Sequence, residues 1–204
     1  MNPARLLAAC LAAVVAFAVA TAVWAQSPPT RLRGSIAAID GKTATIATRE
    51  GSSVKVNLAD NWVVMLVSPV TMADIKENSF VGIASMKGPD GTLNALEVLV
   101  FPEAARGSGE GHYPWDLQPD SVMTNATVGT ITQAPQGNVI KVSYKGTESE
   151  YTVDPTTPIF ANATGDRSLL VPGAAVFVIA SKHDDGKLTS ARLYVEKDGI
   201  KPPM

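Results

Sequence analysis

The residues best suited to chemistry gather in one segment of the chain, GEGHYPWDLQPDS. It contains His112, Tyr113, Trp115 and Asp116. Ser108 precedes it, so a Ser-His-Asp set can be written down. A catalytic triad is defined by geometry, however, and spacing alone does not predict one. The chain also has no Gly-x-Ser-x-Gly nucleophile elbow. We therefore expect a protein without catalytic activity.

The same segment allows two interpretations. Pro114 and Pro119 bias their neighbours toward extended backbone, which places Tyr113, Trp115 and Leu117 on one face. In the first interpretation, this face packs against folded domains and fixes their orientation, because aromatic side chains bury large areas. In the second, the segment lines a cleft between domains, where ligands tend to bind. The candidate ligand-binding residues are then His112, Tyr113, Trp115 and Asp116.

A soft-metal site is the alternative chemistry. Trp62, Met65 and Met72 lie in NWVVMLVSPVTM, and thioether sulfur selects Cu(I). This stretch is similar to the periplasmic copper-chaperone barrels, in which Met and His bind Cu(I) beneath a Trp, so His112 would complete the set. The seven-residue spacing of the two methionines departs from the Met-x-Met pair of that family. In the competing interpretation, Met65 fills a hydrophobic core. Apart from this copper alternative, we expect no cofactor.

The first residues predict export. Arg5 precedes a long apolar run that ends in the small residues Val23 and Ala25, as in a cleavable signal peptide. We expect a signal helix over residues 1–25, cleavage near Ala25, and a periplasmic or secreted protein. An uncleaved membrane anchor is the other interpretation.

Composition narrows the partners. Loss of residues 1–25 removes Arg5 and the only cysteine, leaving 16 basic and 19 acidic residues and a net charge of −3. A chain without thiols holds no disulfide and no thiolate metal site. A mildly negative charge without a Lys/Arg cluster argues against nucleic acids and anionic membranes as partners. An unidentified small molecule or a periplasmic protein remains.

An internal repeat organises the rest of the sequence. GSIAAIDGKTATI and GTITQAPQGNVIKV open two similar regions, and Gly34 matches Gly129 at an offset of 95 residues. Each region alternates short apolar runs with turn signals such as DGK, EGS and PDG. TMADIKENS and GDRSLLVPG could each add one helical turn. Short strands in this number are typical of a small closed barrel, because closure removes exposed edges.

These openings, together with the hairpins DGTLNALEV and DGKLTSARL, resemble a bacterial exported domain of unknown function with an OB-like small barrel, often found in tandem. The resemblance covers residues 32–102 and 125–198 and implies a fold without catalytic residues. We therefore expect an all-β protein: two tandem small antiparallel β-barrels, OB-like, joined by an extended linker over 103–124. Its expected role is non-catalytic binding or scaffolding through the groove between the barrels or a strand face, with periplasmic copper binding as the alternative.

Overall fold

The computed structural model describes residues 28–135 and 137–202, so the expected signal segment lies outside the described residues. These residues form twelve strands and three single-turn 3-10 helices, without an α-helix. None of these helices has the length and apolar character to cross a membrane. The protein is therefore all-β, as the alternating sequence pattern predicts.

The strands follow the two repeats in order. The first repeat supplies β1 (Thr30–Asp40), β2 (Thr43–Thr48), β3 (Ser53–Pro69), η1 (Met72–Asp74), β4 (Phe80–Lys87) and β5 (Leu93–Val100). The segment between the repeats holds η2 (Glu103–Ala105) and β6 (Gly111–Pro114). The second repeat supplies β7 (Val122–Ala134), β8 (Gly137–Tyr144), β9 (Thr147–Val153), β10 (Ile159–Thr164), η3 (Arg167–Leu169), β11 (Ala175–Lys182) and β12 (Leu188–Val195). The helical turns η1 and η3 fall within the two predicted segments.

Five strands close a barrel of mixed direction. β1 pairs antiparallel with β2 and β11, β2 pairs antiparallel with β3, and β11 pairs antiparallel with β12. A parallel pairing of β12 with β3 completes the ring. Side chains at alternate positions fill its interior, among them Ile36, Ile46, Val56, Val178 and Leu193.

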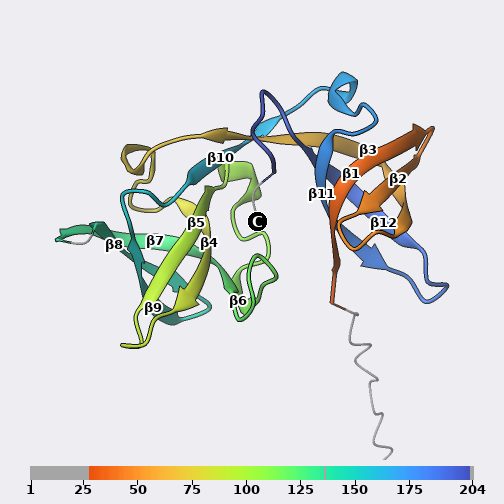
Figure 1. Ribbon diagram of the computed structural model, residues 1–204. Helices are drawn as coiled ribbons and strands as arrows, with labels where there is room; N and C mark the ends of the chain where they lie inside the picture. Colours follow the sequence, from red (N-terminus) through yellow and green to blue (C-terminus); the bar gives the residue numbers. More distant parts are fainter. Residues whose placement is uncertain (1–27, 136, 203–204) are drawn as a thin grey trace, which may run out of the picture.

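The remaining strands lie beside this barrel (Figure 1). They pair in the order β5-β4-β7-β8-β9, and β5 also meets β9 in a short parallel pairing at Leu93 and Asn94. β6 adds to β7, while β10 bonds antiparallel to β3 and parallel to β5 and so connects the two groups of strands. Ile83, Val98, Ile140 and Tyr151 belong to the hydrophobic cluster of this second group.

The expectation of one barrel per repeat is not met. The closed barrel takes β1, β2 and β3 from the first repeat and β11 and β12 from the second. The reason lies in β3, which is long and runs to Pro69. It pairs with β12 up to Met65 and with β10 from Met65 to Pro69, so it carries the chain out of the barrel before β4 begins. β11 and β12 of the second repeat complete the ring.

A third hydrophobic cluster lies where the two groups of strands meet. It is built from β3, β4, β5, β7, β11, β12 and the segment between the repeats: Val67, Ala84, Leu99, Trp115, Met123, Phe177 and Tyr194. Because one cluster draws on both groups, their relative position is fixed by packing.

Candidate functional site

A pocket of about 760 Å³ lies between the two groups of strands. Pockets of roughly 300–1,000 Å³ accommodate small-molecule ligands. The outer face of β1, β11 and β12 forms one wall, because the alternate residues Leu32, Val178 and Leu193 point into the barrel. The residues contributed by this wall are Arg31, Phe177, Ile179, Arg192 and Tyr194.

The opposite wall belongs to the second group of strands and to the strap, the name we give to residues 108–121. This wall contains Gly82, Leu99, Phe101, Met123 and Asn125, with Ser108, Gly109, Tyr113, Pro114 and Trp115 from the strap. Gly82 allows the neighbouring side chains of this wall to pack closely. A Cβ there would lie 2.8 Å from the Asn125 Oδ1 atom and 3.1 Å from the Phe101 ring.

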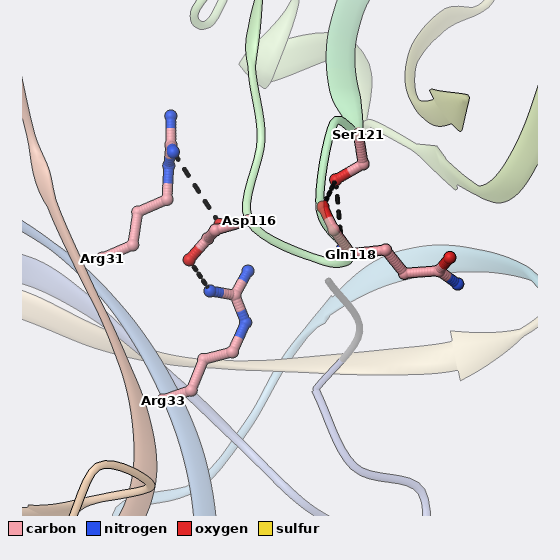
Figure 2. A network of polar contacts seen from close by, with 5 residues as sticks. All are labelled: Arg31, Arg33, Asp116, Gln118 and Ser121. Carbon is pink, nitrogen blue, oxygen red and sulfur yellow. Dashed lines mark hydrogen bonds and ion pairs between the residues drawn. The ribbon is translucent and has the colours of Figure 1, made fainter. Parts of the chain in front are cut away.

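The strap is anchored to the barrel by charge. Figure 2 shows the Asp116 carboxylate between two arginines of β1: it accepts a hydrogen bond from the Arg33 guanidinium and lies 3.8 Å from the Arg31 Nη1 atom. Arg33 is buried, with 8% of its side chain exposed, whereas Asp116 is 44% exposed. A buried guanidinium needs such a partner, because an unpaired buried charge is costly.

Aromatic contacts strengthen the same anchor. The Arg31 guanidinium carbon lies 4.1 Å from the centroid of the Trp115 ring, and the Arg33 guanidinium carbon lies 4.7 Å from that of Phe177. The Trp115 ring meets two other rings edge to face, that of Tyr113 at 6.1 Å and that of Phe177 at 6.3 Å between centroids. Cation–π and edge-to-face contacts of this kind stabilise desolvated sites.

A short loop closes behind Trp115. The Trp115 backbone N–H donates to the Ser121 carbonyl at 2.8 Å. The Ser121 hydroxyl donates to the Gln118 carbonyl at 2.7 Å (Figure 2). The Gln118 backbone N–H in turn donates to the Ser121 hydroxyl at 3.1 Å. These bonds hold Trp115 and Asp116 against β1, so the strap is a fixed part of the pocket wall.

Two buried polar atoms in the wall have no hydrogen-bond partner within the described part of the chain. They are the Nε1 atom of Trp115, a donor, and the Oδ1 atom of Asn125, an acceptor. Their residues are 8% and 7% exposed. Most buried polar groups are paired, so each exception needs an explanation. Both atoms have under 1 Å² of accessible surface, so neither faces the open space of the pocket.

Tyr113 adds a hydroxyl to this wall. The Asn125 Nδ2 atom donates to its oxygen at 3.1 Å, which leaves the phenol proton available for another acceptor. Burial raises the pKa of Tyr113, with the Arg31 charge opposing the shift. Burial likewise raises the pKa of Tyr194. Both phenols therefore remain protonated donors at neutral pH.

His112 lies apart from the pocket. Its Nδ1 atom is 2.8 Å from the Thr124 hydroxyl, which is 2.6 Å from the Tyr151 hydroxyl, and its ring stacks on Tyr144. It is exposed and does not line the pocket. Of the four candidate ligand-binding residues, Tyr113 and Trp115 line the pocket, Asp116 anchors the strap, and His112 faces the second group of strands.

The residues of the copper alternative are not brought together. Trp62 belongs to the barrel core, Met65 packs against the cluster between the two groups, and Met72 packs against the core of the second group. The Arg167 guanidinium carbon lies 4.1 Å from the centroid of the Trp62 ring. In the part of the chain that the structure describes, no cluster of three His, Cys, Asp or Glu residues could hold a metal ion.

Sequence reasoning missed the cationic and amide residues of the pocket. Arg31 and Arg33 flank Leu32 in the strand sequence RLRG, which places both guanidiniums on the face opposite the core. That alternation was visible in the sequence. No local sequence pattern identifies Arg192 or Asn125 as pocket residues, because each comes to line the pocket only when strands distant in the sequence pack together.

Comparisons with protein-family models, curated proteins and solved structures find no match for this chain. The all-β architecture with a five-stranded closed barrel thus rests on the structure itself. The resemblance to an exported tandem-barrel domain stays a prediction.

Proposed function

We propose that this chain is an exported, non-catalytic protein that binds a small molecule in the pocket between its two groups of strands. The proposal of export rests on the signal-like first 25 residues. The proposal of binding rests on the pocket, whose volume of about 760 Å³ suits a compact organic ligand. A concave site favours a small molecule over a protein partner, which would need a broad surface.

One observation carries the proposal. The pocket combines mostly apolar walls with a few polar groups, the guanidiniums of Arg31 and Arg192 and the phenol of Tyr113. This combination is typical of small-molecule sites. A bound molecule would gain hydrophobic contact with the apolar side chains and polar contacts with these three groups.

We also propose that the second group of strands is a barrel of the same design, so that the two repeats exchange halves. Every pairing in the closed barrel has a counterpart: β1 with β11 corresponds to β7 with β4, and β3 with β12 to β9 with β5. Five strands joined in this way are compatible with an OB-like barrel.

Producing residues 28–102 and residues 103–202 as separate chains tests the exchange. We expect cooperative unfolding only when the two chains are mixed. Cooperative unfolding of either chain alone would refute the exchange.

Fluorescence of N-phenyl-1-naphthylamine, a neutral apolar probe, tests the binding function. We expect a saturable rise in emission with the wild-type protein. Ile179 lines the pocket and is 41% exposed, so Ile179→Trp should fill the entrance and abolish the rise without unfolding the chain.

Val171→Trp is the matched control, because Val171 is also an exposed apolar residue, at 53%, but does not line this pocket. It should bind the probe as the wild type does. Circular dichroism verifies that all three proteins are folded. An absence of saturable binding by the wild type, or equal binding by Ile179→Trp, would refute the pocket as the site and direct the search to protein partners.

A further inference from the structure

We infer that the pocket takes an apolar molecule bearing a carboxylate. This inference rests on the proposed function and names the chemical class of its ligand. The apolar part would lie against Leu99, Phe101 and Met123, and the carboxylate would face the arginines of the opposite wall.

The charge of the pocket differs from that of the protein. The chain carries a formal net charge of −2. Among the described residues that line the pocket, however, Arg31 and Arg192 are the charged ones and none is acidic. A site lined by one sign of charge between low-dielectric walls attracts a ligand of the opposite sign.

The protein neutralises these cations only in part. Among the described residues, Asp116 is the carboxylate paired with Arg31, at 3.8 Å, and it is shared with Arg33, which it contacts directly. Within residues 28–135 and 137–202, the Arg192 guanidinium pairs with no carboxylate. An anion in the pocket would therefore gain charge-assisted hydrogen bonds without displacing an internal partner of Arg192.

A neutral donor on the other wall fits the same group. The Tyr113 phenol accepts from Asn125 while keeping its own proton to donate. A carboxylate accepts hydrogen bonds and donates none, so this phenol and the arginines opposite suit it better than they suit an amine. The planar guanidinium also matches the two carboxylate oxygens geometrically.

Calorimetric titration with three ten-carbon molecules tests this inference: decanoate, decanol and decylamine. We expect decanoate to bind about tenfold more tightly than decanol, since hydrogen bonds to charged groups contribute more than neutral ones, and decylamine not to bind. Arg192→Gln should lower the affinity for decanoate roughly tenfold and change that for decanol by less than about twofold. Arg49→Gln, an arginine outside this pocket, is the control and should change neither.

The outcomes separate the two proposals. Equal affinity for decanoate and decanol, or an equal loss for both in Arg192→Gln, would overturn the carboxylate while leaving the pocket as a binding site. Tighter binding of decylamine would overturn it as well. Failure of all three molecules together with the neutral naphthylamine probe would overturn the binding function itself.

Discussion

The guanidinium of Arg31 lies over the ring of Trp115, with 4.1 Å between the guanidinium carbon and the ring centroid. Arg31 belongs to the closed barrel, whereas Trp115 belongs to the strap that runs along the second group of strands. A contact of this kind contributes about 1–2 kcal/mol when it is partly desolvated. It joins the two sides of the pocket, so the stability of the fold and the shape of the site depend on the same residues.

Replacement of Trp115 should separate packing from ligand contact. Trp115→Ala is expected to lower the free energy of unfolding by about 3–5 kcal/mol, because it leaves a cavity in the central cluster. Trp115→Phe keeps most of the apolar wall, so it should cost less stability and change the affinity for decanoate by less than Trp115→Ala does. Urea denaturation and calorimetry measure the two effects. A stable Trp115→Ala protein would show that the strap does not hold the two groups together.

The Asp116 anchor gives a second prediction. Asp116→Asn removes the charge that pairs with the buried Arg33 and should lower the free energy of unfolding by about 1–2 kcal/mol, since Asp116 itself is partly exposed. Asp60→Asn is the control, because the pair of Asp60 with Lys42 is exposed on both sides and exposed pairs contribute little. Equal stability of the two variants in denaturant titrations would argue against an anchoring role.

Two glycines at equivalent positions of the repeats test the closed barrel. A Cβ on Gly34 would lie 1.9 Å from the Ala47 carbonyl oxygen, whereas one on Gly129 would have its nearest neighbour, the Lys141 carbonyl oxygen, at 3.5 Å. Gly34→Ala should therefore lower the free energy of unfolding by about 2–3 kcal/mol, and Gly129→Ala should change it by less than about 1 kcal/mol. Thermal denaturation compares them. Similar melting temperatures would contradict the close approach of β1 and β2.

The buried tyrosines predict a loss of stability at alkaline pH. Burial raises the pKa values of Tyr113, Tyr151 and Tyr194 above the ordinary 10.0. Below pH 10.0 these phenols are protonated in both the folded and the unfolded chain, so their titration does not lower the free energy of unfolding. As the pH rises past 10.0, tyrosines in the unfolded chain lose their protons first, so the free energy of unfolding falls.

Lysines also titrate at alkaline pH. Comparing the free energy of unfolding of the wild type with that of Tyr194→Phe isolates the effect of the Tyr194 phenol. The variant should show a shallower decline in stability above pH 10.0, measured by urea denaturation at a series of pH values. Parallel curves would show that Tyr194 titrates alike in the folded and unfolded states.

Local features of this fold could be predicted from the sequence, because they depend on neighbouring residues. Gly41, Gly51 and Gly91 have positive φ angles at the predicted turns, and the strands follow the apolar alternation. The composition of the closed barrel, which takes strands from both repeats, could not be predicted. β1, β2 and β3 pair with β11 and β12, which are distant in the sequence. The continuation of β3 past Leu58 to Pro69 also carries no distinct local signal.

The candidate site, like the fold, could be predicted from the sequence only in part. The strap was visible as an unusual segment, and Tyr113 and Trp115 do line the pocket. His112, directly before Tyr113, points away from Tyr113 because adjacent residues of a strand such as β6 point to opposite sides. Arg192 and Asn125 line the pocket only because strands distant in the sequence pack together, and no local sequence pattern predicts that packing.

The most direct test of the central claim is the fluorescence of Trp115 during a decanoate titration. A chain starting at Gln26 with Trp62→Phe leaves Trp115 as the single tryptophan, and its indole lies in the pocket wall. We expect a saturable change in its emission with one decanoate bound per chain. Emission that stays constant throughout the titration, in a protein that circular dichroism shows to be folded, would contradict it.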